Sequence, residues 1–147
     1  MRYYLSLGAN LGEREQTINL ALSLIEQQIG SILRRSSFYY SEPWGFQSEH
    51  PFCNLCCAIE TALEPLEMLH QTQAIERELG RKEKTPLTIN HSPLTIPPYS
   101  DRSIDIDLIR AFDDQGAELF IDTPELTVPH KLWTQRDFVK VPLAEIL

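Results

Sequence analysis

The sequence predicts an α+β fold: a ferredoxin-like antiparallel sheet with two helices on one face and loops roofing the other. Two segments carry apolar residues at helical spacing, and four shorter segments have the composition and turn boundaries of strands. Their order along the chain is β-α-β-β-α-β, which is the order of this sandwich. A length of 147 residues is typical of one domain, so we expect a single domain over residues 1–147.

The first strand and the first helix are separated by a glycine-containing turn. Residues 2–7 are rich in Tyr and Leu and predict a strand, and residues 8–12 predict the turn. A stripe of apolar residues then recurs at helical spacing and ends at Gly30, a common helix stop. The stripe consists of Ile18, Ala21, Leu22, Ile25 and Ile29.

Two strands and a second helix follow. Residues 32–40 predict the second strand, residues 41–51 a loop with two prolines, and residues 52–61 the third strand. Pro65 suits the first position of the second helix, which we expect to end at Gly80. The stripe that marks this helix consists of Met68, Thr72, Ile75 and Leu79.

The last part of the chain begins with a long connection. Residues 82–100 hold four prolines without clear periodicity, which is typical of a functional lid or of disorder. Residues 103–110 predict the fourth strand, and residues 118–121 predict a short edge strand. The pattern assigns no element to residues 126–147.

The composition excludes several classes of partner. A net charge of −8 and a pI near 4.9 argue against duplex nucleic acid or an anionic membrane, because both attract basic surfaces. No stretch approaches the length of a membrane span, and the first five residues are too polar for a signal peptide. We therefore expect a cytoplasmic protein.

Three cysteines, Cys53, Cys56 and Cys57, lie within one short segment. An odd number so closely spaced does not form a disulfide framework. Cys53 and Cys56 have the C-x-x-C spacing of some metal sites, but on a strand their side chains point to opposite faces. We expect buried, reduced core cysteines.

Asp105 and Asp107 alternate with Ile104, Ile106 and Leu108 in the fourth predicted strand. Residues two apart on a strand share a face, about 7 Å apart, so both carboxylates point away from the core together. Paired like charges gain nothing from folding unless a cation lies between them, and oxygen ligands suit magnesium. The alternative is a solvated polar face of a half-exposed strand.

Other residues near the same face suit two ligands, one with a flat aromatic ring and one with phosphate groups. Asn54 shares a strand face with Phe52, and rings around an amide suit a flat heteroaromatic ligand. Ordinary packing is the alternative for these aromatic residues. The basic residues that could meet phosphates are Arg81, Arg102, His130 and Arg136.

Several ordered segments resemble one enzyme family. They are residues 7–12 (LGANLG), 36–45 (SSFYYSEPWG), 101–107 (DRSIDID), 126–130 (LTVPH) and 136–138 (RDF), with Glu76 and Gly80-Arg81 between them. Together they resemble hydroxymethyl-dihydropterin pyrophosphokinase of folate biosynthesis over nearly the whole chain. The resemblance implies transfer of diphosphate from ATP to the hydroxymethyl group of 6-hydroxymethyl-7,8-dihydropterin, with release of AMP.

The resemblance also implies site residues. Asp105 and Asp107 would hold two Mg²⁺ ions, and Arg102 and Arg81 would join them in catalysis. The pterin pocket would consist of Ser41, Pro43, Trp44, Phe52, Asn54 and Phe138. The ATP contacts would come from Leu69, Gln73, Glu76, Arg81, Tyr99, Arg102, Leu108, Thr127, His130 and Arg136. The implied partners are ATP and the reduced pterin, with no nucleic acid and no membrane, and we expect a monomer.

A second interpretation is a catalytically degenerate module that binds pterin or nucleotide on the same fold. Glu83 favours it, because it stands where the family usually has a second arginine. The retained Asp105, Asp107, Arg102 and His130 favour the enzyme.

Overall fold

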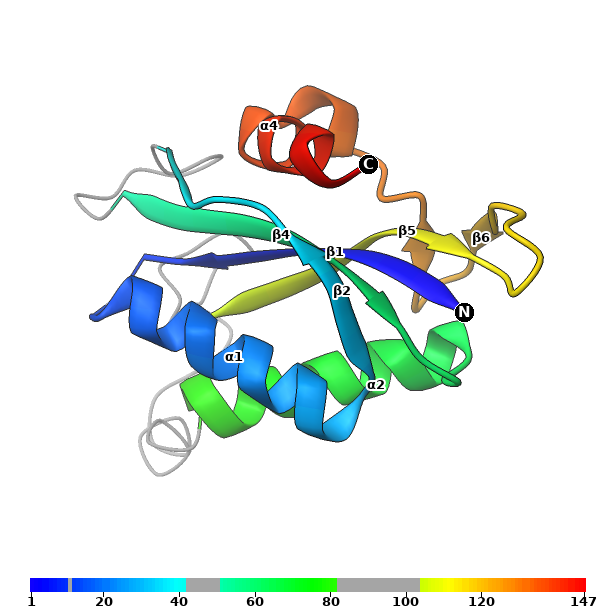
Figure 1. Ribbon diagram of the computed structural model, residues 1–147, viewed down its shortest axis with the longest axis horizontal. Helices are drawn as coiled ribbons and strands as arrows, with labels where there is room; N and C mark the ends of the chain where they lie inside the picture. The colour runs from blue at the N-terminus through cyan, green and yellow to red at the C-terminus, as the bar shows by residue number, and fades with distance from the viewer. Residues whose placement is uncertain (11, 42–50, 82–103) are drawn as a thin grey trace.

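The computed structural model describes residues 1–10, 12–41, 51–80, the backbone of residue 81, and residues 104–147. Most of the predicted loop at 41–51 and the whole proline-containing connection at 82–100 lie outside these residues. Figure 1 shows the arrangement of the helices and strands.

One antiparallel sheet organises the chain. Its strand order is β2-β4-β1-β5, and a short strand, β3, also pairs with β4. The strands are β1 (Arg2–Ala9), β2 (Ser31–Arg35), β3 (Tyr39–Ser41), β4 (Phe52–Glu60) and β5 (Asp105–Phe112). This pairing and the element order confirm the predicted α+β class.

Two helices lie side by side on one face of the sheet (Figure 1). They are α1 (Arg14–Gln28) and α2 (Pro65–Glu76), and α2 runs on into a π-helix, Arg77–Arg81. Pro65 occupies the first turn of α2, and Glu64 and Glu67 form a capping box there. Among the described residues no helix is long and apolar enough to cross a membrane.

The sheet presents one alternating set of side chains to these helices. Apolar residues of both layers form the main core, and every second residue of β1 and of β4 belongs to it. The buried strand members are Tyr3, Leu5, Leu7, Ala9, Cys53, Leu55, Cys57, Ile59, Ile106, Leu108 and Ala111. The helix members include Ile18, Ala21, Leu22, Ile25, Met68 and Ile75.

The cysteines lie as the strand pattern predicts. Cys53 and Cys57 belong to the helix-side core, whereas Cys56 belongs to the cluster on the other face. All three are buried and free of disulfides. Burial raises the pKa of the Cys53 thiol to about 11 and that of Cys56 to about 12, so both stay protonated at neutral pH.

A third α-helix, α4 (Asp137–Ile146), covers part of the second face of the sheet (Figure 1). Its buried Val139, Leu143 and Ile146 follow one helical stripe. They pack with a smaller sheet-side cluster made of Tyr4, Cys56, Ala58 and Ile109. Pro142 lies inside α4, and because an internal proline argues against a helix, the sequence pattern gave no helix here.

The second predicted strand, residues 32–40, is divided into β2 and β3. Between them, the Ser36 N–H donates to the Cys56 carbonyl at 2.8 Å, and the Cys56 N–H donates to the Ser36 hydroxyl at 3.0 Å. The N–H of Ser37 then donates to Glu145 of α4 at 3.0 Å. A side chain therefore replaces one ladder bond at the break, and the linker is attached to α4.

The segment after β5 differs from the predicted edge strand at 118–121. Glu118 makes only an isolated bridge to Phe112, and the strand that forms is β6 (Ile121–Asp122), paired with β7 (Thr127–Val128). The guanidinium of Arg110 donates to both carboxylate oxygens of Glu118, at 2.9 and 2.8 Å. This bidentate pair joins the segment to β5.

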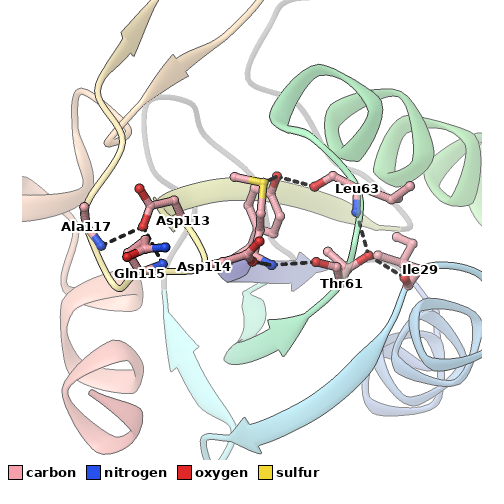
Figure 2. A network of polar contacts seen from close by, with 9 residues as sticks. Ile29, Thr61, Leu63, Asp113, Asp114, Gln115 and Ala117 are labelled. Atoms are coloured by element: carbon pink, nitrogen blue, oxygen red, sulfur yellow. Dashed lines mark hydrogen bonds and ion pairs between the residues drawn. The ribbon is translucent and has the colours of Figure 1, made fainter.

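A polar network ties the sheet together at the end remote from Asp105 (Figure 2). The Thr61 hydroxyl donates to the Ile29 carbonyl at 2.6 Å and accepts from the Leu63 N–H at 3.2 Å. The Tyr3 hydroxyl donates to the Leu63 carbonyl at 2.7 Å. These bonds fix the ends of α1, β4 and β1 relative to one another.

The packing of α4 gives a stability prediction. Replacing the fully buried Leu143 with Ala should lower the free energy of unfolding by about 2–4 kcal/mol, because it leaves a cavity between α4 and the sheet. Val141→Ala on the same helix, where the side chain is 46% exposed, should cost less than about 0.5 kcal/mol. Denaturant unfolding measures both, and equal losses would contradict this packing.

Candidate functional site

One row of residues crosses three neighbouring strands on the face that α4 partly covers. Gly8 of β1 is paired with Asn54 of β4 on one side and with Asp105 of β5 on the other. In the next row on the same face, Ser6 is paired with Cys56 and with Asp107. The pairing therefore brings together Asn54, Asp105 and Asp107, which lie far apart in the sequence.

The two aspartates have the placement that the strand pattern predicts. Ile104, Ile106 and Leu108 are 5% exposed or less and belong to the helix-side core. Asp105 and Asp107 alternate with them, are only partly buried, and so lie on the opposite face. Their Cα atoms are separated by about one strand repeat, roughly 7 Å.

These carboxylates fit a magnesium site by their chemistry. Magnesium takes oxygen ligands and is usually held by one or two carboxylates, with water and substrate phosphates completing its shell. Among the described residues there is no group of three or more His, Cys, Asp or Glu side chains that could form an all-protein metal site. The donor set therefore suits an ion that arrives with a phosphorylated substrate.

Asn54 is held in one orientation. Its amide nitrogen donates to the Tyr39 carbonyl at 3.1 Å and to the Ser41 hydroxyl at 2.8 Å, and its side chain is 2% exposed. The amide oxygen is directed to the Gly8 side, because a Cβ atom added at Gly8 would lie 2.9 Å from it. The structure thus brings Ser41 and Asn54, both predicted pterin residues, into direct contact.

Gly8 is a further candidate site residue, which the sequence pattern does not identify. An added Cβ would also lie 3.5 Å from the Phe52 ring, so glycine keeps open the space between Asn54 and Phe52. The sequence prediction ended the first strand before Gly8, whereas β1 continues to Ala9. A glycine inside a strand often marks a close approach of another group, which is the signal that could have identified it.

His130 and Arg136 approach the same region from the segment after β7. The His130 N–H donates to the Ile109 carbonyl of β5 at 2.9 Å, and its Nδ1 accepts from the Leu132 N–H at 3.1 Å. Arg136 is 6% exposed, and its guanidinium carbon lies 5.6 Å from the centre of the Phe138 ring. The segment therefore holds a histidine, an arginine and an aromatic ring close to β5.

The electrostatic surroundings keep His130 neutral. Burial lowers the pKa of His130, the positive charge of Arg136 lowers it further, and the negative charge of Asp105 opposes both. Because Nδ1 accepts a hydrogen bond, the neutral ring carries its proton on Nε2 and can donate it. The charges of Arg136 and Asp105 therefore act on His130 in opposite directions.

Glu76, the last residue of α2, reaches the same strand from the helical layer. Its Oε2 accepts the N–H of Ile106 at 2.7 Å, so its carboxylate lies against the main chain between Asp105 and Asp107. The resemblance implied an ATP contact for Glu76, and the structure adds this main-chain bond.

The remaining predicted residues are placed as follows. Leu69 packs against the helix-side core, Leu108 is buried in it, and Gln73 is exposed on α2. The Thr127 hydroxyl of β7 donates to Asp122 at 3.3 Å. Arg81 ends the π-helix. The predicted residues that lie outside the described part of the chain are Pro43, Trp44, Tyr99 and Arg102.

Comparison with solved structures supports the fold. A chain described as HPPK-DHPS in complex with substrates superposes with a TM-score of 0.65 at 15% identity, covering 99% of this chain and 40% of that one. A Plasmodium falciparum HPPK-DHPS chain gives 0.65 at 17% identity, covering 99% and 39%. This chain therefore spans about 40% of these solved chains, and the likeness concerns the fold alone.

Comparison of sequences identifies the family. The family model described as 7,8-dihydro-6-hydroxymethylpterin-pyrophosphokinase (HPPK) matches residues 4–147. A 2-amino-4-hydroxy-6-hydroxymethyldihydropteridine pyrophosphokinase from Porphyromonas gingivalis is 43% identical over 143 residues, covering 97% of this chain and 88% of that protein. The Bacillus subtilis protein of the same name is 34% identical over 144 residues, covering 97% and 76%. The chain therefore belongs to the 7,8-dihydro-6-hydroxymethylpterin-pyrophosphokinase family.

Proposed function

We propose that this protein transfers diphosphate from ATP to the hydroxymethyl group of 6-hydroxymethyl-7,8-dihydropterin in folate biosynthesis, releasing AMP. The observation that carries the proposal is the row Asn54–Gly8–Asp105, with Asp107 beside it on the same sheet face. This row sets an amide suited to a heteroaromatic ring next to carboxylates suited to a metal-bound triphosphate. A single domain, a monomer and a cytoplasmic location stay predictions.

On the pterin side, Asn54 provides a fixed amide oxygen that accepts hydrogen bonds from ring N–H groups. The amide nitrogen of Asn54 already donates hydrogen bonds to the Tyr39 carbonyl and the Ser41 hydroxyl. The amide is therefore fixed before the ligand binds, and no entropy is lost in ordering it on binding. Phe52 and Phe138 offer ring faces for stacking, together with Trp44 and Pro43 of the predicted pocket.

On the nucleotide side, Asp105 and Asp107 would hold two Mg²⁺ ions, which would neutralise the negative charge of the ATP phosphates. Arg136 provides a positive charge, and neutral His130 provides an Nε2–H donor for phosphate oxygens. The other predicted ATP contacts are Leu69, Gln73, Glu76, Arg81, Tyr99, Arg102, Leu108 and Thr127.

The reaction needs positioning more than covalent help from the protein. The pterin hydroxyl oxygen forms a bond to the β-phosphorus of ATP, and the bond between that phosphorus and the oxygen bridging to the α-phosphorus breaks. AMP leaves with the bridging oxygen, and the hydroxyl proton is released. The pterin side of the site lies on β4 and the nucleotide side on β5, the two strands that flank β1. Holding the hydroxyl and the β-phosphorus on one rigid sheet face in this way makes the encounter effectively intramolecular.

The central test is AMP formation. With ATP, Mg²⁺ and reduced hydroxymethylpterin, the protein should release AMP stoichiometrically with diphosphorylated pterin, and only when pterin is present. Asp105→Ala and Asp107→Ala should each lower turnover on the order of 100-fold or more while leaving the unfolding transition in place. Glu60→Ala removes an exposed carboxylate at the far end of the sheet and should leave turnover unchanged.

Normal turnover in either aspartate variant would contradict the metal assignment. If the unaltered protein releases no AMP but still binds pterin tightly, the degenerate binding module is favoured instead. Glu83, which stands where the family usually has a second arginine, agrees with that alternative.

Gly8 offers a separate test of the pterin side. Gly8→Ala should weaken pterin binding about tenfold, equivalent to about 1.4 kcal/mol, because the new methyl group forces the Asn54 amide oxygen to move and fills the space beside Phe52. Binding of the α,β-methylene analogue of ATP should change little. Fluorescence titration measures the affinity for pterin, and calorimetry measures the affinity for the ATP analogue. Equal losses of the two affinities would contradict the placement of Gly8 on the pterin side of the site.

The neutral state of His130 predicts a pH dependence. Because its pKa is lowered in the folded protein, the unfolded chain binds more protons below about pH 6.5, and stability falls as the pH drops toward the folded pKa. His130→Asn cannot titrate, and its amide oxygen can still accept the Leu132 N–H. Between pH 7.5 and 5 the unaltered protein should lose more unfolding free energy than this variant, whereas parallel curves would contradict the prediction.

A further inference from the structure

The outer edge of β5 is held by a side chain at the point where the two aspartates lie. In the described sheet β5 is the last strand, so its edge away from β1 has no strand partner there. The N–H of Ile106 on this edge donates to Glu76 Oε2 at 2.7 Å. A main-chain donor at a sheet edge needs an acceptor, and here a carboxylate provides one.

This bond fixes the main chain of the aspartate segment from its second side. In an antiparallel ladder the N–H groups of alternate residues point to opposite edges. Since the Ile106 N–H goes outward, those of Asp105 and Asp107 point toward β1, where these residues are paired with Gly8 and Ser6. The segment is thus held by β1 on one edge and by Glu76 on the other.

The acceptor at this edge is a charged carboxylate and not a neutral group. Glu76 adds a third negative charge beside a strand that already carries Asp105 and Asp107, and like charges oppose one another. A hydrogen bond from an N–H to a carboxylate is shorter and stronger than one to a neutral acceptor. The length of 2.7 Å agrees with that stronger class.

The position of Glu76 in the chain connects the two layers. It is the last residue of α2, directly before the π-helix Arg77–Arg81. Short π-helical segments occur frequently at functional sites. The junction lets the side chain leave the helix toward the edge of β5.

We propose that Glu76 is a positioning residue, whose carboxylate fixes the main chain between Asp105 and Asp107 so that both carboxylates are presented together to Mg²⁺ and ATP. The inference rests on the proposed function and assigns Glu76 a role through the aspartates. Groups behind metal ligands commonly change metal affinity by about 10- to 100-fold when they are replaced.

Two substitutions separate the hydrogen bond from the charge. Glu76→Gln removes the charge, but its amide oxygen can still accept the Ile106 N–H. Glu76→Asp keeps the charge, but its carboxylate is withdrawn by one carbon–carbon bond, about 1.5 Å, and loses the contact. If the bond positions the strand, Glu76→Asp should be the more damaging change.

The measurement is the Mg²⁺ dependence of AMP formation, together with calorimetric binding of the α,β-methylene analogue of ATP at several Mg²⁺ concentrations. Glu76→Asp should raise the half-saturating Mg²⁺ concentration about tenfold, and Glu76→Gln should stay within about threefold of the unaltered protein. Pterin affinity should be unchanged in both. Hydrogen exchange at the Ile106 amide should accelerate in Glu76→Asp only.

Glu67 provides matched controls on the same helix. Its carboxylate accepts the N–H of Glu64 at 3.2 Å at the opposite end of α2, so Glu67→Gln and Glu67→Asp make the same chemical changes away from β5. Both should leave the Mg²⁺ dependence unchanged. A shift in these controls equal to that of Glu76→Asp would overturn the proposal, because the effect would then arise from α2 as a whole.

Two further outcomes decide against the proposal: an unchanged Mg²⁺ requirement in Glu76→Asp, or a raised requirement in Glu76→Gln alone, which would make the charge the cause. If the unaltered protein forms no AMP, the proposed function fails. The Mg²⁺-dependent binding of the analogue and the exchange of the Ile106 amide then still test Glu76 independently.

Discussion

The antiparallel pairing of β1 with β4 on one side and β5 on the other determines where the polar side chains of the candidate site lie. Because strand side chains alternate, a slip of one residue would send Asp105 and Asp107 into the helix-side core and expose Ile106 to the site. Leu5 and Leu7 of β1 are fully buried beneath α1 and α2, so hydrophobic burial opposes such a slip. The geometry of the site is therefore a consequence of the packing of the opposite face.

The periodic parts of the fold could be predicted from the sequence because local patterns encode them. Alternation in residues 103–110 is enough to place both aspartates on one face, and Pro65 marks the start of α2. Alternation also separates Cys53 from Cys56. The break between β2 and β3 depends on Ser36 bonding to Cys56, a contact 20 residues away, so no local pattern contains it. At α4 the local signal points the other way, because Pro142 inside the helix argues against a helix.

The candidate site shows the same division between local and distant information. The spacing of the aspartates in the sequence is enough to predict that they share a face. Gly8 is recognised as a candidate site residue only from the strand pairing, which places it between Asn54 and Asp105. The neutral state of His130 likewise depends on burial and on Arg136, which lies six residues later and reaches it through the tertiary fold. Residue types could be proposed from sequence, but their orientation and protonation depend on contacts made between elements.

The second face of the sheet has an apolar part, which packs against α4, and a polar part, which forms the candidate site. Near the start of β1, α4 buries Tyr4, Cys56, Ala58 and Ile109. Toward the end of β1 the face carries Gly8, Asn54 and Asp105. Arg136 and Phe138 lie at the start of α4, so the helix that covers the apolar part also brings a cation and a ring to the edge of the polar part. Glu76 reaches β5 from the layer of α1 and α2. The helices on both faces of the sheet therefore make contacts with β5. A reaction that relies on positioning and charge neutralisation needs such a rigid support, because small displacements of the reacting groups lower its rate.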